Sequence, residues 1–346
     1  MIATQTQSKH SYTWTQRTAS AAYAPRDGAR GVVVGSRLYL LGGWDPSNSA
    51  FTAGAWPAGT TNEVWYSDNR GVTWSQLLTQ DPATTTRWKP RHEFGCLHFG
   101  GYVYVVGGDS NSGTCQTDVW RAPDSDLTSW TRMAADWGCG NRVLYSCWER
   151  SGSIYVAGGQ TIASLVGGGI DTYFSDVWAS TNNGATFTQL ATSVPLASHN
   201  ACGSVNYQGQ TWFVAGGKYK AQFARGVHST LDGVTFTAHP DGPFDKRYYT
   251  DCALFDGKLW LYGGYADTSQ YSEAGGADIS GLTGFNRGDC WYTNNGDSWQ
   301  RYTPTEATGT TPPLSHASTV YGLPDGLIIA AGNHLTRQVW ELHVTP

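Results

Sequence analysis

A short apolar run that ends in two glycines recurs along the chain. The run at 102–108, Tyr-Val-Tyr-Val-Val-Gly-Gly, is typical. Complete doublets occur at 42–43, 107–108, 158–159, 216–217 and 263–264, and a degenerate sixth run ends at Gly332. The copies follow one another at intervals of 47 to 68 residues. Repeats of roughly this period, built from β-branched and aromatic residues, predict six four-stranded antiparallel blades arranged around an axis.

An aromatic pair follows the doublet in most copies. In the first copy Trp65 precedes Trp74, whereas the last copy has Trp340 and no aromatic residue after it. Trp14, close to the start of the chain, has sequence surroundings similar to those of Trp74. We therefore expect residues 1–18 to supply the closing strand of the C-terminal blade, which leaves no sheet edge open in the ring. The predicted fold is an all-β, six-bladed β-propeller.

The composition fits this architecture. The chain has 43 Gly, 16 Trp and 19 Tyr with only 14% charged residues, which favours short strands and tight turns. We expect residues 1–346 to form a single propeller. A net charge of −5 with scattered Lys and Arg argues against nucleic-acid binding. No apolar run reaches the roughly 18 to 20 residues of a membrane span, and residues 1–5 lack the features of a secretory signal, so we expect neither membrane insertion nor a signal peptide.

The repeats resemble a known family. The doublets, the Asp-Val-Trp segments at 118–120 and 176–178, and the Pro-Arg openings at 25–26 and 90–91 are similar to Kelch repeats of the Kelch and galactose-oxidase-like superfamily, over nearly the whole chain. The resemblance implies the propeller fold. It leaves the function open, because Kelch-type propellers include protein-interaction modules, sugar-acid mutarotases, oxidases and adhesins.

Three predicted hairpins, at 67–74, 180–187 and 292–299, resemble the Asp-box of sialidase-type propellers. Asn69, Asn182 and Asn294 stand where that motif has Asp. We interpret these segments as tight turns, in which Asn bonds its own backbone and Gly adopts a positive φ. They are no evidence of sialidase activity.

The candidate site rests on a register. The residues sixteen positions before the first Gly of each copy are Arg26, Arg91, Arg142, Asn200, Arg247 and Ser315, and polar neighbours beside them are Asp27, His92, Asn141, His199, Tyr248 and His316. This position precedes the innermost strand, so these side chains should surround the mouth of the central channel. Four arginines there suggest bidentate binding of an anionic ligand such as a carboxylate, a uronic or sialic acid, or an acidic peptide. In the alternative interpretation they pair with carboxylates or carbonyls within the blades.

Long loops after the first, third and fifth doublets share this face. Their aromatic residues are Trp44, Phe51, Trp56, Tyr173, Phe174, Tyr265, Tyr271 and Phe285. Such residues either stack on sugars or a partner protein, with Trp56 and Tyr271 as candidate ligand contacts, or fold back and plug the loops. Cys115 and Cys139 fall on the same face in adjacent blades, where an oxidising environment would allow a disulfide. We predict no metal and no cofactor.

These observations favour a non-catalytic recognition propeller that binds a glycan, an acidic ligand or a partner protein at the channel mouth. Few Lys and much Thr, Ser, Gly and Trp fit a surface adhesin or a phage virion or tail component that assembles into a larger particle, at a virion or extracellular surface or in the cytoplasm. The alternative is an enzyme like the Kelch mutarotases, an epimerase or a lyase acting on sugar acids. In that case the arginines would fix a carboxylate while Asp27, His92, His199, Tyr248 or His316 move protons.

Overall fold

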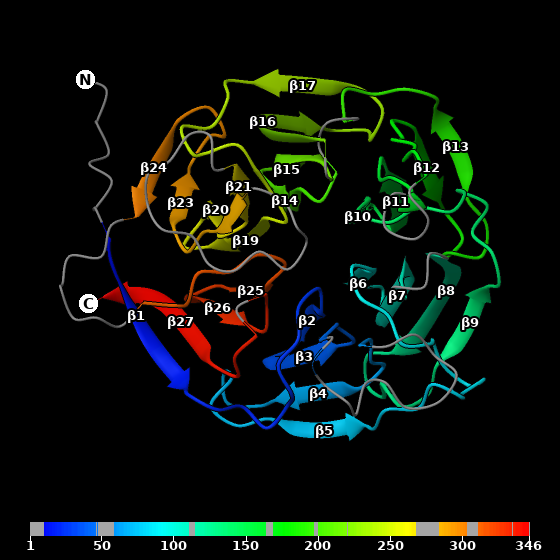
Figure 1. Cartoon of the computed structure of the whole chain (residues 1–346), viewed down its shortest axis with the longest axis horizontal. Helices are drawn as coiled ribbons and strands as arrows, with labels where there is room; N and C mark the ends of the chain where they lie inside the picture. Colours follow the sequence, from blue (N-terminus) through cyan, green and yellow to red (C-terminus); the bar gives the residue numbers. More distant parts are fainter. Residues whose placement is uncertain are drawn as a thin grey trace.

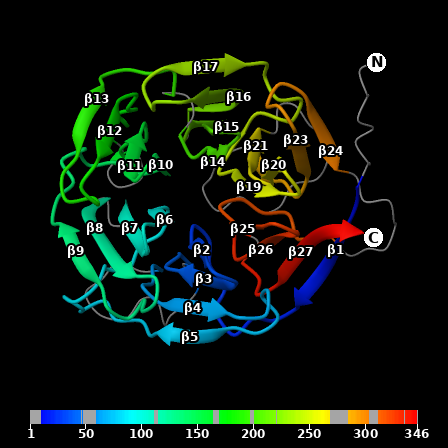
Figure 2. The same ribbon diagram turned by 180° about the vertical axis from the view of Figure 1, so that it is seen from behind.

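A computed structural model describes residues 10–45, 47, 59–110, 115–163, 169–196, 200–219, 221–267, 284–302, 311–333 and 335–345. These residues contain 27 named β-strands, arranged as a ring of blades around a central channel (Figures 1 and 2). No helix among the described residues has the length and apolar character needed to span a bilayer.

Each blade is an antiparallel sheet whose first strand lies next to the channel and whose fourth strand lies at the rim (Figure 1). The first three blades are β2 (Arg30–Val34), β3 (Arg37–Leu41), β4 (Val64–Ser67) and β5 (Ser75–Leu78); β6 (Gly95–Phe99), β7 (Tyr102–Asp109), β8 (Cys115–Pro123) and β9 (Thr131–Ala134); and β10 (Ser146–Arg150), β11 (Ser153–Ala157), β12 (Val177–Ser180) and β13 (Thr188–Ala191). The last three are β14 (Gly203–Tyr207), β15 (Gln210–Lys218), β16 (Gln222–Thr230) and β17 (Phe236–His239); β19 (Asp251–Phe255), β20 (Lys258–Tyr262), β23 (Cys290–Thr293) and β24 (Trp299–Tyr302); and β25 (Thr319–Leu323), β26 (Gly326–Ala330), β27 (Val339–Thr345) and β1 (Ser11–Thr18). The predicted all-β propeller of four-stranded blades is confirmed.

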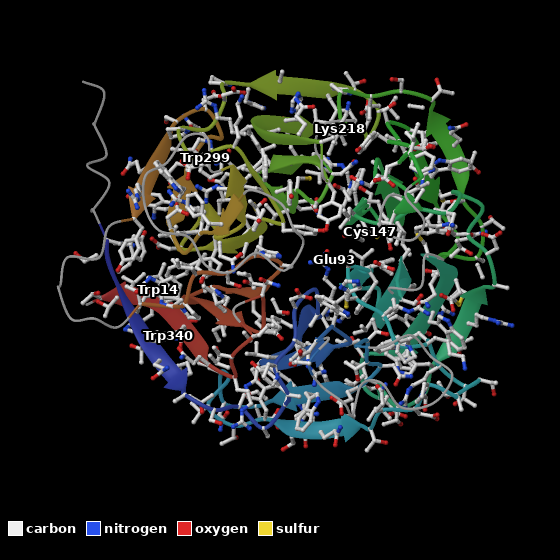
Figure 3. The ribbon with its side chains drawn as sticks, in the orientation of Figure 1. Trp14, Glu93, Cys147, Lys218, Trp299 and Trp340 are labelled. Atoms are coloured by element: carbon white, nitrogen blue, oxygen red, sulfur yellow. The ribbon has the colours of Figure 1, made fainter. Side chains whose placement is uncertain are left out.

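The two ends of the chain meet in the last blade, as predicted. β1 pairs antiparallel with β27 from Ser11–Thr345 to Thr18–Val339. Tyr12 and Trp14 point inward and keep 7% and 8% of their surface exposed. Trp14 lies beside Trp340 in the side-chain view (Figure 3). The N-terminal strand therefore closes the ring with backbone hydrogen bonds and with apolar contacts.

The fourth blade belongs to a larger sheet. Five blades are separate four-stranded sheets, whereas β14–β17 share a seven-stranded sheet with three short strands, β18 (Arg247–Tyr248), β21 (Tyr265–Asp267) and β22 (Gly284–Asn286). Ala224 of β16 pairs with Arg247 of β18 to make the link. These short strands belong to the segments before and after the inner hairpin of the fifth blade, so they join the fourth and fifth blades.

The core is divided among the contacts between neighbouring blades. Each pair of adjacent blades buries its own apolar cluster, for example Leu40 and Tyr321 between the first and last blades, or Trp260 and Leu327 between the last two. The same holds for the other four pairs. Burial of large apolar side chains is the main favourable term here, so each blade depends on both neighbours for stability.

The glycine doublets are explained by backbone conformation and by space. Gly42 and Gly43 both have positive φ, at +63° and +112°. A Cβ on Gly43 would lie 2.9 Å from Cδ of Arg26. The doublet is therefore required both for a left-handed turn and for an arginine to pack against it.

The fourth blade corrects one register in the sequence interpretation. There Ala215 and Gly216, at φ of +60° and +99°, take the place of the doublet, because the ladder shifts between Val214 and Gly216. Asn200 pairs with Gly217, as Asp27 pairs with Trp44 in the first blade. Asn200 is therefore equivalent to Asp27, and the arginine position of this blade falls on His199, outside the described residues.

Candidate functional site

The four predicted arginines occupy equivalent positions, and all are buried. Arg26, Arg91 and Arg247 are 0% exposed and Arg142 is 2% exposed. Each Nη1 donates to the carbonyl of the first glycine, sixteen residues later, at 2.8 to 3.1 Å. The spacing seen in the sequence is thus a direct hydrogen bond between the segment before the inner strand and the turn that follows the second strand.

Each guanidinium also pairs with a carboxylate of its own blade. Arg91 donates to both oxygens of Asp118, at 2.7 and 3.2 Å, and Arg247 bonds Asp289 in the same way at 2.7 and 3.1 Å. The equivalent pairs are Arg26 with Glu63 and Arg142 with Asp176. The carboxylate accepts a further hydrogen bond from the indole N–H two residues later, as in Trp120 to Asp118 at 2.7 Å. We call this arrangement the Arg–acid–Trp unit.

The last blade, which has Ser315 at the arginine position, also lacks the acid. Gln338 replaces the carboxylate, so Trp340 donates to the amide oxygen of Gln338 at 2.8 Å. An uncompensated charge in this position would carry a large desolvation cost, so the two charges form one structural unit.

This geometry corrects the interpretation of Arg26, Arg91, Arg142 and Arg247 as an anion-binding floor. Their guanidinium groups lie inside the blades and are paired with carboxylates and carbonyls of the same blade. The alternative from the sequence, a structural role, fits their placement. The Asp-Val-Trp segments were the sequence signal for this role, because they carry the acid and the indole donor.

The mouth face is the side of the ring that holds the loops between second and third strands and the segments before the inner strands. A ring of six left-handed residues lies there, two positions after each arginine position: Gly28, Glu93, Leu144, Ala201, Tyr249 and Ala317, with φ between +48° and +58°. Backbone N–H groups of this ring donate to the equivalent carbonyl of the preceding blade, as from Glu93 to Gly28 at 2.9 Å and from Gly28 to Ala317 at 3.0 Å. The mouth thus has a backbone frame that joins neighbouring blades.

Two predicted site residues, Asp27 and His92, lie together on this frame. His92 Nε2 is 3.2 Å from Oδ2 of Asp109, and His92 Nδ1 is 3.8 Å from Oδ1 of Asp27. Burial favours the neutral imidazole, but the hydrogen bonds and charges of both carboxylates outweigh burial and raise the pKa of His92 to about 10. The Trp44 ring lies 5.8 Å from the imidazole. His92 is therefore an imidazolium between two carboxylates at neutral pH.

The polar contacts continue across two further blades to His316. Asn333 Nδ2 donates to Oδ2 of Asp27 at 2.8 Å, and Asn286 Nδ2 lies 3.4 Å from Oδ1 of Asn333. His316 Nδ1 is 2.5 Å from Oδ1 of Asn286. Sequence reasoning found Asp27, His92 and His316, but it missed Asn286 and Asn333, which connect them and lie in no repeated motif.

The other predicted residues are placed apart from this network. Tyr248 is buried in a stack with Phe223 and Tyr265, at ring distances of 4.5 and 5.7 Å. Asn200 accepts a hydrogen bond from Gly159 at 2.8 Å and is 1% exposed. Trp56, Tyr271 and His199 lie outside the described residues. Among the described loop aromatics, Tyr265 and Phe285 are buried, which favours the plugging role for these two, whereas Trp44 is half-buried.

The cysteines of the described residues are free thiols. Burial raises the pKa of both Cys115 and Cys139 to about 12. The disulfide expected under oxidising conditions is absent from the described structure. No group of three or more His, Cys, Asp and Glu side chains in the described ranges is arranged to hold a metal ion.

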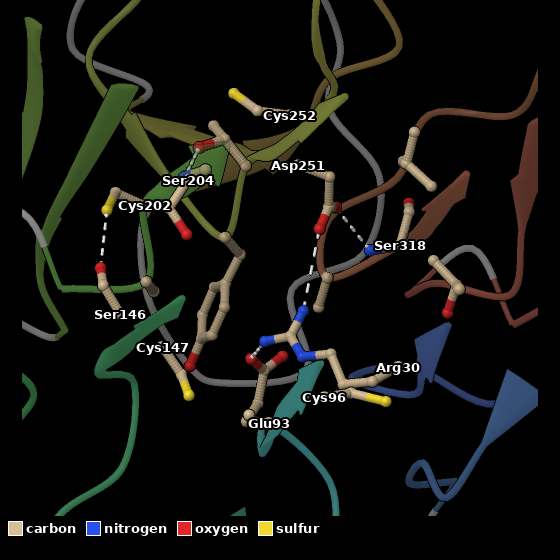
Figure 4. A pocket seen from close by; sticks show the side chains of 18 of the residues that line it. Arg30, Glu93, Cys96, Ser146, Cys147, Cys202, Ser204, Asp251, Cys252 and Ser318 are labelled. Carbon is tan, nitrogen blue, oxygen red and sulfur yellow. Dashed lines mark hydrogen bonds and ion pairs between the residues drawn. The ribbon is translucent and has the colours of Figure 1, made fainter. Parts of the chain in front are cut away.

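A polar cavity of about 200 Å³ occupies the centre of the ring (Figure 4). All six inner strands or the segments before them line it. Its charged residues are Arg30, Glu93 and Asp251, from the first, second and fifth blades. Sequence reasoning did not select them, because each is a single charge with no repeated equivalent.

The comparisons with known proteins agree with this description. A family model for the Kelch motif matches residues 90–121, which contain Arg91, its doublet, Asp118 and Trp120. An F-box/kelch-repeat protein of Arabidopsis thaliana is 24% identical over 203 residues, which is 55% of this chain and 48% of that protein. The chain thus spans about half the length of this curated relative. The resemblance to Kelch repeats found in the sequence is confirmed.

Proposed function

We propose that this Kelch-repeat β-propeller is a recognition module that binds a partner protein through its mouth face. The observation that carries the proposal is the division of roles within each blade. The Arg–acid–Trp units and the inter-blade clusters fix a ring, whereas the mouth-face loops differ in length and sequence from blade to blade. Rigid scaffolds with variable loops are the usual arrangement for binding.

A contact between neighbouring blades offers a defined place to test this surface. Lys218 of β15 lies with Nζ 5.3 Å from the ring centre of Tyr173, which belongs to the third blade. Both side chains are half-buried, and the Tyr173 hydroxyl donates to the carbonyl of Tyr219 at 3.3 Å. Tyrosine is among the side chains that most often anchor protein interfaces. Figure 3 marks the position of Lys218 on the ring.

The experiment compares two faces of the same ring. We would capture proteins from the native source with the parent, with a Lys218→Ala, Tyr173→Ala variant, and with Leu231→Ala as a matched control. Leu231 is 63% exposed in the hairpin between β16 and β17, at the opposite face. A partner should bind the parent and Leu231→Ala, and be lost from the mouth-face variant. Equal binding to all three, or selective loss from Leu231→Ala, would refute this assignment of the face.

The finer proposals from the sequence make separate predictions. A glycan-binding adhesin or virion component should bind sugars on a glycan array without any partner protein. The Tyr173→Ala change should weaken that binding. An enzyme acting on sugar acids should lose turnover in His92→Gln without loss of substrate binding. The acidic-ligand version no longer rests on the four arginines, because their charges are neutralised inside the blades.

A further inference from the structure

The central cavity contains one cation and two carboxylates. Arg30 begins β2 and extends into the channel, where Nη2 lies 2.5 Å from Oε2 of Glu93 in the second blade. Its Nη1 lies 3.8 Å from Oδ1 of Asp251 in the fifth blade. The last blade stands between the first and the fifth in the ring, so the contact with Asp251 crosses the channel (Figure 4).

Arg30 is held more firmly by the second blade than by Asp251 of the fifth blade. Nε donates to the carbonyl of Phe94 at 3.2 Å, next to Glu93, so the second blade holds the guanidinium at two points. Asp251 instead accepts a hydrogen bond from the backbone N–H of Ser318 at 2.9 Å and lies beyond hydrogen-bond distance of Arg30. The side chains of Glu93 and Asp251 are 7% and 14% exposed, so water compensates little of their charge.

One guanidinium cannot neutralise two buried carboxylates. Burial, together with the charge of Glu93, outweighs Arg30 and the Ser318 N–H and raises the pKa of Asp251 to about 8. Weak acids whose pKa values are raised by burial surround this cluster: Tyr145, Tyr249, Tyr262, Tyr321, Cys96, Cys147, Cys202 and Cys252. The charged groups next to Glu93 are His92, whose pKa is raised to about 10, and its partners Asp27 and Asp109. The weak acids and His92 remain protonated while Asp251 titrates, so the proton balance of the cavity depends on Asp251.

We propose that Arg30 is a proton-controlled crossbar of the channel, held by Glu93 while Asp251 carries a proton and drawn to Asp251 when that proton leaves. In the protonated state the described distances apply, and Asp251 is tied only to its own side of the ring. In the ionised state the guanidinium bridges both carboxylates and links the first and fifth blades across the channel. A shift of this kind needs only a small rotation of one side chain, because Nη1 already faces Asp251.

The test follows the carboxyl group of Asp251 and the guanidinium group of Arg30 by NMR. In protein with ¹³C-labelled aspartate, the carboxyl signal of Asp251, assigned through its own backbone resonances, should titrate near pH 8, against an ordinary value of 3.8. The ¹⁵N signals of the Arg30 guanidinium should shift with the same midpoint. In Asp251→Asn those signals should stay constant through this range, and in Glu93→Gln the midpoint of Asp251 should fall by more than one pH unit, because Arg30 becomes available to it.

Two results would overturn the proposal, and both come from the parent protein. Asp251 already ionised at pH 5 would show that it needs no proton. Arg30 signals that do not move while Asp251 titrates would show that the two groups are not coupled. The parent titration therefore decides the question even where a variant fails to fold.

Discussion

Arg91 holds both carboxylate oxygens of Asp118, at 2.7 and 3.2 Å, from a position with no exposed surface. Asp118 follows Arg91 by 27 residues, on the third strand of the same blade. The same guanidinium binds the carbonyl of Gly107 at 2.8 Å, so it ties together three segments of the blade. Arg91 therefore contributes to the stability of the folded blade.

Replacing Arg91 should destabilise the protein strongly. Arg91→Ala leaves Asp118, whose side chain is only 17% exposed, without its counter-charge, and removal of one partner of a buried pair costs about 3–5 kcal/mol. Urea unfolding should show this loss in the free energy of unfolding. Arg132→Ala, on an exposed position of β9, should change that free energy by less than about 0.5 kcal/mol. Equal effects of the two changes would contradict the buried-pair account.

The loss of folding stability at acid pH should depend on Asp289. Burial disfavours its ionised form, but the charge and hydrogen bonds of Arg247 prevail and lower the pKa of Asp289 to about 2. Because the folded-state pKa lies below the ordinary value of 3.8, the pair contributes stability at higher pH that is lost as the pH falls from about 4 to 2. Melting temperatures recorded across this range should fall more steeply for the parent than for Asp289→Asn. Asp241→Asn, 62% exposed, is the control and should follow the parent.

The closing strand should be needed for the whole ring. Trp14 packs against Tyr262 of the fifth blade, with ring centres 6.3 Å apart. Trp14→Ala should lower the free energy of unfolding by about 3–5 kcal/mol, as for other buried aromatic residues, and deletion of residues 1–18 should cost more. Thr13→Ala, on the exposed face of the same strand, is the matched control. A deletion variant that melts within a degree or two of the parent would disprove closure by this strand.

The ring was predictable because its signals are local in the chain. The doublets, the Asp-Val-Trp segments and Trp14 each determine a turn or a strand, and their repetition gave the blades. The role of the arginines was not predictable from spacing alone, because each guanidinium pairs with a carboxylate 27 to 42 residues later, which only the folded blade brings next to it. The register error at Asn200 has a similar cause: Gly216-Gly217 looks complete, but the irregular ladder of β15 and β16 shifts the turn to Ala215.

His92 should remain protonated well above neutral pH. Its two carboxylate neighbours, Asp27 and Asp109, raise its pKa to about 10. This folded-state pKa lies above the ordinary 6.5, so the interaction stabilises the protein below about pH 6.5 and is lost as the pH rises toward 10. Imidazole ¹⁵N shifts at pH 8 should be those of a doubly protonated ring. Shifts of a neutral tautomer would contradict the network, and His92→Gln should abolish this part of the alkaline loss of stability.

The channel thiols should be slow to react. Burial raises the pKa of Cys96 from 9.0 to about 12, so at pH 8 its thiolate fraction is roughly a thousandfold below that of an ordinary cysteine. Native protein should therefore react slowly with Ellman's reagent, whereas protein unfolded in guanidinium should release the signal of all seven cysteines at once. Rapid modification of Cys96, located by peptide mapping of native protein, would be inconsistent with this burial.

The cluster of Arg30, Glu93 and Asp251 shows what repeats cannot reveal. Each residue departs from its equivalents in the other blades, and only the closed ring brings the three into one cavity. Such differences carry no periodic signal, so they were invisible until the inner strands were placed around the axis.

The pairing of β1 with β27 also determines how the ring responds to tension. Ser11 lies opposite Thr345, so the two ends of the closing pair are on the same side of the blade. A pull on both chain ends would load the hydrogen bonds of this pair one after another, as in a zipper, instead of shearing them together. Tyr12 and Trp14 are the first buried side chains on that path, so their apolar contacts would resist the opening of the propeller first.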